Sequence, residues 1–245
     1  MAQSGWWMAL LLAAGWCGAV APAAGELHSV DEDRFELLRR RMVERDIVRR
    51  GVTDQATLEA MRKVPRHRFV PPGAVEMAYD DRPLPIGHGQ TISQPYIVAY
   101  MTEQVQPRPD QRILEIGTGS GYQAAVLAEI VGEVYSIEIV QPLAERVERF
   151  FSGDPRYRNI SVRHGDGYHG WPGAAPFDAI VVTAASETIP PPLIQQLKDG
   201  GRMIIPVGPA LGAQHLVLVT KEEGRMRTRI LFPVRFVSFT CVRGL

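Results

Sequence analysis

The chain has 245 residues, of which 45% are hydrophobic and 22% are charged, and its 27 basic and 27 acidic side chains leave no formal net charge. This composition fits one sizeable globular domain and argues against a dedicated nucleic-acid binder, which would carry a basic excess. With Cys17 and Cys241 as the only cysteines, a disulfide framework and a cysteine-based zinc site are excluded.

The amino-terminal stretch differs from the rest of the chain. Residues 1–25 contain no charged side chain, and an apolar run from Trp6 to Ala21 precedes small residues of the kind that signal peptidase cuts. We interpret this stretch as a cleaved export signal or a membrane anchor outside the fold. Because a basic n-region is missing and the run is shorter than the about 20 residues of a membrane span, a misassigned start and a disordered extension remain alternatives.

Helical patterns follow. Between positions 31 and 50, apolar residues recur at helical spacing and a glycine ends the pattern: Phe35, Leu38, Met42, Ile47 and Gly51. We expect a helix there, and its mixed arginines and carboxylates predict a solvated, ion-paired face rather than an RNA-binding surface. A second helix is expected to end at Pro65.

The stretch from Tyr79 to Pro95 is rich in glycine, proline and polar residues and lacks periodicity. Loops of this length without secondary structure are uncommon in compact domains and are often functional. A helical pattern follows from Ile97 to Glu103. We therefore predict that this loop enters a ligand cleft.

The run from Ile113 to Tyr122 reads Ile-Leu-Glu-Ile-Gly-Thr-Gly-Ser-Gly-Tyr and predicts a strand, a tight turn and a helix N-terminus. Its glycine spacing differs from the Gly-x-Gly-x-x-Gly of dinucleotide-binding turns, and Glu115 would repel a pyrophosphate but attract a cationic amine. A second strand ends in Glu138, where a carboxylate can bind ribose hydroxyls. S-adenosylmethionine, which carries a sulfonium and an ammonium but no phosphate, is therefore favoured over NAD.

Further strands and one helix complete the pattern. Strands are expected over 160–164, 177–183 and 202–207, a helix over 189–197, and a hairpin from the runs 215–221 and 226–233. This alternation predicts an α/β fold with a doubly wound, mostly parallel sheet, N-terminal helices and an antiparallel hairpin near the C-terminus. We divide the chain into a signal-like or anchor-like segment (1–25) and one domain (31–245), which comprises N-terminal helices with a substrate loop (31–100), a cofactor-binding core (111–210) and the C-terminal hairpin (213–245).

Several motifs resemble known enzymes. The glycine turn with Glu115, the turn at Asp166-Gly167 and the strand entry at Gly200-Gly201 are similar to class I S-adenosylmethionine-dependent methyltransferases, which are Rossmann-like. The stretches Pro85-Ile-Gly-His-Gly-Gln-Thr-Ile-Ser-Gln-Pro-Tyr96 and Pro65-Arg-His-Arg-Phe-Val70 resemble the protein-L-isoaspartate O-methyltransferase family. The similarity runs from about Arg34 to about Phe236. The residue His88 and the uncharged N-terminus depart from the family pattern.

The resemblance implies methylation of the free carboxylate of L-isoaspartyl residues in damaged proteins, which initiates repair through a succinimide. A carboxylate with a pKa of about 4 is already ionised at neutral pH, so no general base is expected. The family motif assigns Ser93 as the catalytic residue that orients this carboxylate, although its position before Pro95 alone is also typical of a helix N-cap. The expected substrate-binding residues are Thr91, Ile92 and Gln94. The expected cofactor-binding residues are Glu115, Gly117, Thr118, Gly119, Gly121, Tyr122, Glu138, Asp166, Gly167, Thr183 and Ala184.

Other functions remain open on the sequence alone. The alternatives are an NAD-dependent oxidoreductase, a class I methyltransferase acting on a small molecule or RNA, and an exported, non-catalytic module that binds the cofactor. No metal site is expected, because His164 and His169 lack a supporting ligand pattern. We expect a monomer that acts on isoaspartyl peptides and proteins in the cytoplasm, where S-adenosylmethionine is made, with no nucleic-acid partner. The alternative is a periplasmic protein, or one anchored in the membrane through residues 1–25 if that segment is retained.

Overall fold

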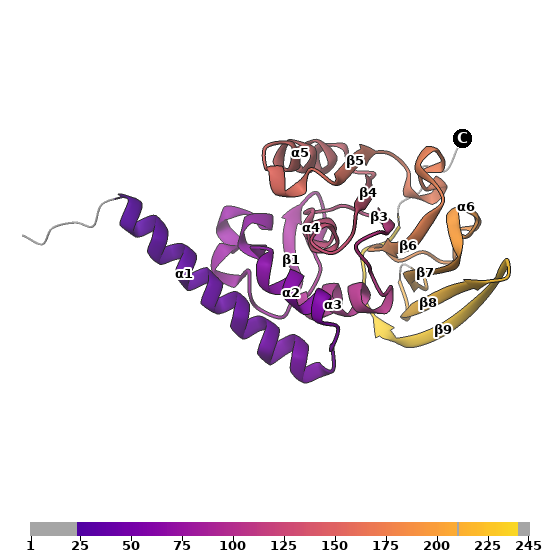
Figure 1. Ribbon diagram of the computed structural model, residues 1–245, viewed down its shortest axis with the longest axis horizontal. Coiled ribbons are helices and arrows are strands. Elements are labelled where there is room, and N and C mark those ends of the chain that lie inside the picture. The colour runs from indigo at the N-terminus through magenta and orange to yellow at the C-terminus, as the bar shows by residue number, and fades with distance from the viewer. Residues whose placement is uncertain (1–23, 210, 240–245) are drawn as a thin grey trace, which may run out of the picture. The chain divides into compact units, whose positions relative to one another are not determined.

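The computed structural model describes residues 24–209 and 211–239, and Figure 1 shows their helices and strands. Its contacts divide the chain into two units, Met1–Arg34 and Phe35–Leu245. The predicted signal or anchor at residues 1–25 lies outside the described residues, except that α1 (Ala24–Met42) begins at its end. Among the helices built from the described residues, none has the length and apolar character needed to cross a bilayer.

The part of the second unit that precedes the main sheet consists of short helical turns, two helices and two short strands. After α1 these are η1 (Val43–Ile47), η2 (Val48–Arg50), α2 (Gln55–Lys63), η3 (Arg66–Phe69), η4 (Pro72–Met77), β1 (Leu84–Gly87), β2 (Gln90–Ile92) and α3 (Pro95–Gln104). The helix expected to start at Asp31 starts earlier, at Ala24, and ends in a π turn and a 3₁₀ turn. Gly51, with a φ of 92°, ends this helical segment as predicted.

Seven strands form the main sheet in the order β5-β4-β3-β6-β7-β8-β9 (Figure 1). They are β3 (Arg112–Ile116), β4 (Glu133–Glu138), β5 (Ile160–His164), β6 (Phe177–Val182), β7 (Leu197–Val207), β8 (Gln214–Glu222) and β9 (Arg225–Val234). The strands from β5 to β7 pair in parallel, and β8 and β9 add an antiparallel hairpin. The predicted fold class is thus confirmed. Because β4 and β6 flank β3 on opposite sides, the strand order reverses at β3, and such sheets bind ligands in the crevice at that point.

Helices cover both faces of the sheet, and alternate strand residues face opposite layers. The helices of the main unit that follow α3 are α4 (Tyr122–Ala128), α5 (Gln141–Ser152) and α6 (Pro191–Gln196). Ile113 of β3 packs in the apolar cluster that includes residues of α2 to α5, whereas its neighbour Leu114 packs in the cluster that includes Leu193 of α6. Burial on both faces explains why these strands are nearly continuous apolar runs in the sequence.

The stretch from Tyr79 to Pro95 is not the unstructured loop that we expected. Strands β1 and β2 pair antiparallel within it, with Leu84 opposite Ile92. His88 and Gly89 turn the chain with φ values of 53° and 70°. The apolar side chains of these strands are buried, but they are too few and too often separated by glycine, proline and polar residues to give a visible period-2 pattern.

Candidate functional site

The turn that follows β3 is shaped by three glycines in left-handed conformations. Gly117, Gly119 and Gly121 have φ values of 94°, 54° and 88°, which strongly favour glycine. The amides of Gly117 and Thr118 donate hydrogen bonds to the Ile137 carbonyl of β4 at 2.8 and 3.3 Å. The turn is therefore fastened to the neighbouring strand, and α4 begins directly after Gly121.

These glycines face different surroundings. A Cβ atom at Gly117 would collide with Oγ1 of Thr183, and one at Gly121 would lie 2.9 Å from Cζ of Phe151 in α5. A Cβ atom at Gly119 would have no atom closer than 3.6 Å outside its chain neighbours. Gly119 is therefore the open side of the turn, whereas Gly121 allows α5 to pack closely against it.

Glu138 ends β4 and is held by backbone amides. Its Oε2 accepts a hydrogen bond from the Gly119 amide at 2.7 Å, and its Oε1 accepts one from the Val140 amide at 2.8 Å. The residue lines the cavity above the sheet. Since each carboxylate oxygen has a further lone pair, the fixed group can accept hydrogen bonds from a vicinal diol.

Glu115 is fully buried near the end of β3. Its Oε2 accepts a short hydrogen bond from the Ser136 hydroxyl, and its Oε1 accepts no well-formed hydrogen bond from the described residues. Burial raises the pKa of Glu115 to about 8, and the nearby charge of Glu138 adds to this effect, whereas hydrogen bonding to Ser136 and, more weakly, to the Ala124 amide opposes it. A buried carboxyl with one unsatisfied oxygen, beside a cavity, suits a cationic ligand.

The cavity lies over the carboxyl ends of β3, β4 and β6 and draws in most of the residues predicted from the sequence. The predicted residues that line it are Thr91, Ile92, Ser93, Glu115, Gly117, Thr118, Gly119, Tyr122, Glu138, Gly167, Thr183 and Ala184. The substrate loop and the glycine turn, which are separate in sequence, therefore meet at one site. The ligand-binding roles of these residues remain predictions.

Three predicted residues do not line this cavity. The side chain of Gln94 instead donates to the Asp81 carbonyl at 3.0 Å and to Oδ2 of Asp81 at 2.7 Å. The Asp166 carboxylate accepts a hydrogen bond from the Tyr168 amide at 2.9 Å. Gly121 packs against α5 as described above. Gln94 instead lines the second cavity described below, and Asp166 directly precedes Gly167 of the first cavity. The ligand-binding roles of these three residues also remain predictions.

Tyr122 and Thr183 have structural contacts besides their places in the cavity wall. Tyr122 is 1% exposed, and its hydroxyl lies 3.8 Å from the sulfur of Met61. The hydroxyl of Thr183 lies 2.6 Å from the Gly117 carbonyl and 3.0 Å from the Ile116 carbonyl. Both side chains therefore shape the wall chiefly by packing and by bonds to the backbone.

Ser93 does not serve as the helix cap that its position before Pro95 also suggested. The N-cap of α3 is Gln94, which makes no side-chain capping bond. The Ser93 side chain is partly exposed and lines both the first cavity and a second one beside it. Its hydroxyl is thus placed at the junction of two ligand spaces.

The second cavity continues outward from Ser93. It shares Thr91, Ser93, Thr183 and Val237 with the first cavity. Its remaining walls come from η2, from the start of α3 and from the end of β9 with the chain that follows it: Arg50, Pro83, Gln94, Tyr96, Ile97, Phe232, Pro233, Val234, Arg235 and Phe236. The two cavities therefore lie side by side and share part of their walls.

No pattern in the sequence predicts that the chain segment after β9 reaches the site. Val237, Ser238 and Phe239 line the first cavity, and this segment pairs with Ala185, whose amide donates to the Val237 carbonyl at 2.8 Å and whose carbonyl accepts from the Phe239 amide at 2.7 Å. A single bridge of this kind has no periodic pattern. The place of these residues in the cavity wall becomes visible only when the fold pairs two segments that are distant in the sequence.

Comparisons with known proteins agree with this geometry. A sequence model described as protein-L-isoaspartate(D-aspartate) O-methyltransferase matches residues 38–243. The chain is 59% identical over 216 residues to a protein-L-isoaspartate O-methyltransferase of Opitutus terrae, covering 88% of this chain and 92% of the relative.

Solved structures give the same result. A protein-L-isoaspartate O-methyltransferase matches with a TM-score of 0.73 and 30% identity over 84% of this chain, which spans 65% of that protein. A Plasmodium falciparum protein assigned to this family, solved in complex with S-adenosyl-L-homocysteine, matches with a TM-score of 0.70 and 27% identity over 82% of this chain and 98% of its own. The chain therefore belongs to the protein-L-isoaspartate(D-aspartate) O-methyltransferase family.

Proposed function

We propose that this chain transfers the methyl group of S-adenosylmethionine to the free α-carboxylate of L-isoaspartyl residues in damaged proteins. The observation that carries the proposal is the junction of the two cavities at Thr91, Ser93 and Thr183. A donor in the first cavity and an acceptor in the second would meet there. We therefore name the first cavity the donor cavity and the second the acceptor groove.

The residues of the donor cavity fit S-adenosylmethionine. One carboxyl oxygen of Glu115 is buried and accepts no well-formed hydrogen bond from the described residues, so it is available to a cationic group. Glu138 offers a fixed carboxylate to ribose hydroxyls. The open side of Gly119 leaves room for a ligand against the backbone. A pyrophosphate would instead meet two acidic side chains. The arrangement therefore favours a sulfonium cofactor over a dinucleotide.

The chain's own contribution to the reaction is alignment. When bound, S-adenosylmethionine would supply an electrophilic methyl group, which the acceptor oxygen takes while the carbon–sulfur electron pair stays on sulfur. Ser93 would donate a hydrogen bond to one oxygen of the acceptor carboxylate and leave the other oxygen facing the donor cavity. Because that carboxylate is already ionised at neutral pH, no side chain has to remove a proton. Holding the two reactants nearly in line contributes up to about 7 to 11 kcal/mol.

A peptide methylation assay tests this function. Purified protein is incubated with labelled S-adenosylmethionine and either an isoaspartyl peptide or the same peptide with a normal aspartyl residue. Transfer only to the isoaspartyl peptide is expected, followed by loss of the ester as the succinimide forms. Equal labelling of both peptides, or labelling of neither, would contradict the proposal. RNA and small carboxylic acids as acceptors, and calorimetric titration with NADH, check the other functions considered from the sequence.

We also propose the domain bounds, the oligomeric state and the cellular location of the protein. The domain is taken as residues 31–245 with the three parts given above, and the protein as a monomer that acts in the cytoplasm, where its methyl donor is made. Light scattering of the purified protein tests the monomer. Cell fractionation with sequencing of the first residues of the mature protein tests the location and the fate of residues 1–25. Recovery of activity from the periplasm or the membrane would contradict cytoplasmic action.

A further inference from the structure

Arg50 belongs to the wall of the acceptor groove although it lies far from Ser93 in the sequence. It is the last residue of η2, and the left-handed Gly51 that follows turns the chain away. The Arg50 side chain lines the groove together with Ser93 and Tyr96. The glycine and loop motifs of the family do not include this arginine, so its presence at the groove comes from the fold of the N-terminal turns.

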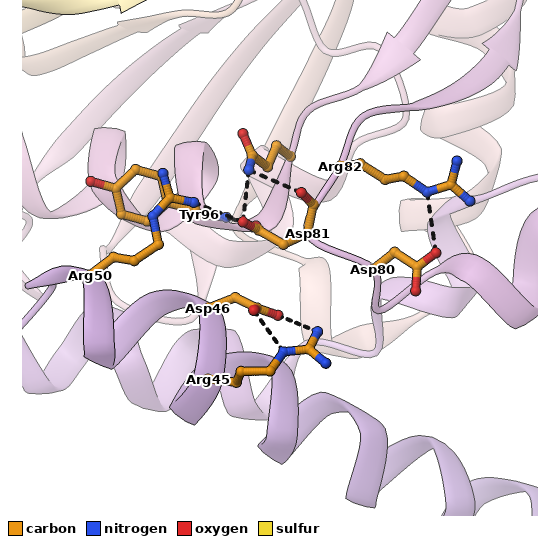
Figure 2. A network of polar contacts seen from close by, with 8 residues as sticks. Arg45, Asp46, Arg50, Asp80, Asp81, Arg82 and Tyr96 are labelled. Carbon is orange, nitrogen blue, oxygen red and sulfur yellow. Dashed lines mark hydrogen bonds and ion pairs between the residues drawn. The ribbon is translucent and has the colours of Figure 1, made fainter.

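The Arg50 guanidinium is held on two sides, as Figure 2 shows. Its central carbon lies 3.4 Å from the centroid of the Tyr96 ring, and Nη1 donates to Oδ2 of Asp81 at 2.8 Å. Asp81 also accepts hydrogen bonds from the Tyr96 amide at 3.0 Å and from Nε2 of Gln94 at 2.7 Å. The Asp81 carboxylate thus holds Arg50 together with Gln94 and Tyr96, which lie one and three residues after Ser93.

These two contacts leave part of the Arg50 guanidinium available to a ligand. The Arg50 side chain is 45% exposed, and a guanidinium has five N–H donors, of which Asp81 occupies one. Two nearby arginines have carboxylates of their own. These pairs, also drawn in Figure 2, are Arg45 with Asp46 and Arg82 with Asp80. A planar, stacked and partly exposed guanidinium is therefore presented to the groove.

The charge of the groove is positive. Its lining includes two arginines, Arg50 and Arg235, and contains no aspartate or glutamate. Asp81 offsets the charge of Arg50 in part, and Arg235 directly follows β9. A basic side chain on a bound peptide would meet like charge here, whereas an acidic one would find a fork of donors that matches a carboxylate.

We propose that Arg50 is a specificity residue, which favours isoaspartyl substrates with an acidic side chain beside the damaged site over substrates with a basic one. The proposal rests on the proposed function, because it assigns the groove to the peptide. The expected preference of glutamate over lysine is about 3- to 5-fold in kcat/KM, the scale of an ion pair that remains partly exposed. Since such pairs are screened by salt, the preference should decline as ionic strength rises.

The test uses isoaspartyl peptides that differ only at one flanking residue, which is glutamate, glutamine or lysine, placed in turn on either side of the damaged site. The wild-type chain should prefer glutamate to lysine on at least one side. Arg50→Gln should bring that ratio close to one, and Arg50→Lys should retain part of it. Arg45→Gln is the matched control, because it removes the same charge from the same neighbourhood without lining the groove, and it should leave the ratio unchanged.

The outcomes separate the two proposals. If the wild-type chain methylates no isoaspartyl peptide, the proposed function fails. If it methylates all of them with equal kcat/KM, or if Arg50→Gln keeps the wild-type ratio, the function stands and the specificity role of Arg50 is wrong. Should Arg50→Gln unfold, the salt series on the wild-type chain decides, since a ratio that is independent of salt would contradict a charge-based preference.

Discussion

The carboxyl group of Glu115 accepts a hydrogen bond from the Ser136 hydroxyl of the neighbouring strand, at a position sealed from solvent. Burial raises the pKa of Glu115 from its ordinary value of 4.5 to about 8, so the carboxyl is mostly protonated at neutral pH. A cation placed beside it would favour the ionised form. The end of β3 thus carries an acid whose protonation would change if a cationic ligand bound beside it.

The first prediction concerns stability and pH. Below pH 4.5 Glu115 is protonated in the folded and the unfolded chain, whereas between pH 4.5 and about 8 the unfolded chain ionises and the folded chain does not. The carboxyl therefore costs stability increasingly over this window, by at most about 1.4 kcal/mol per pH unit. Without cofactor, Glu115→Gln should gain in Tm over the wild type as pH rises from 5 to 8. A difference in Tm that does not change with pH would contradict this.

Binding of S-adenosylhomocysteine should release part of a proton. The ammonium of the ligand favours ionised Glu115, so calorimetric enthalpies at pH 7 should depend on the ionisation enthalpy of the buffer. Glu115→Gln should weaken binding and lose this component of proton release. If the variant shows the same dependence on buffer as the wild type, another group supplies the proton.

Ser93→Ala should lower kcat/KM for an isoaspartyl peptide about 10- to 100-fold, because a hydrogen bond to a charged acceptor is worth about 1.5 to 3 kcal/mol. S-adenosylhomocysteine should still bind with nearly unchanged affinity, as calorimetry would show. Ser152→Ala, at an exposed position of α5, is the matched control and should keep wild-type activity. Near-normal kcat/KM in a folded Ser93→Ala protein would remove Ser93 from the reaction.

Alanine substitutions at two glycines of the turn should differ in their effects on ligand affinity and on thermal stability. Gly119→Ala would place its new methyl group 3.6 Å from Cδ1 of Ile86, an ordinary van der Waals contact, and should weaken S-adenosylhomocysteine binding more than it lowers Tm. Gly121→Ala would press on Phe151 and should destabilise the chain by about 1 to 3 kcal/mol, the usual cost of overpacking. Thermal unfolding and calorimetry on both variants would measure this, and equal effects on binding and Tm would contradict it.

Arg66 offers a test of the core. Its side chain is fully buried, Nε donates to the Ala78 carbonyl at 2.8 Å, and neither Nη1 nor Nη2 has a hydrogen-bond partner among the described residues. Burial lowers the pKa of Arg66 to about 10. Arg66→Met should therefore leave the free energy of unfolding unchanged or raise it by about 1 to 3 kcal/mol. The substitution removes a poorly paired buried charge and keeps an unbranched side chain of similar length. A large fall in the urea midpoint would show that stacking over Tyr122 outweighs this cost.

The sequence predicts those elements whose pattern is local. Buried strands such as β6 are nearly continuous apolar runs, and the turn at Gly117 needs a conformation that only glycine adopts readily, so both are visible without tertiary knowledge. The β1–β2 pair is different, because it depends on a few anchors such as Leu84 and Ile92 that pack against distant helices. Its strands therefore looked like a loop.

The site shows the same division. Ser93 and Glu138 were predicted from motifs, and the structure brings them to one cavity. Arg50 and Phe239 were missed, because each reaches its cavity through contacts between distant segments rather than through a repeat or a spacing. Asp166 was also predicted from a motif, and its side chain accepts a hydrogen bond from the Tyr168 amide beside Gly167 of the cavity wall, so its role toward the cofactor stays a prediction.

The bridge between Ala185 and Ser238 also has a consequence for the order of events in synthesis. The donor cavity takes lining residues from as early as Gln90 and as late as Phe239. A chain still held on the ribosome can complete its parallel strands before that last wall has emerged. If this cavity holds the methyl donor as proposed, the complete wall exists only after residue 239 has left the ribosome, so stabilisation by the whole site would come at the end of synthesis.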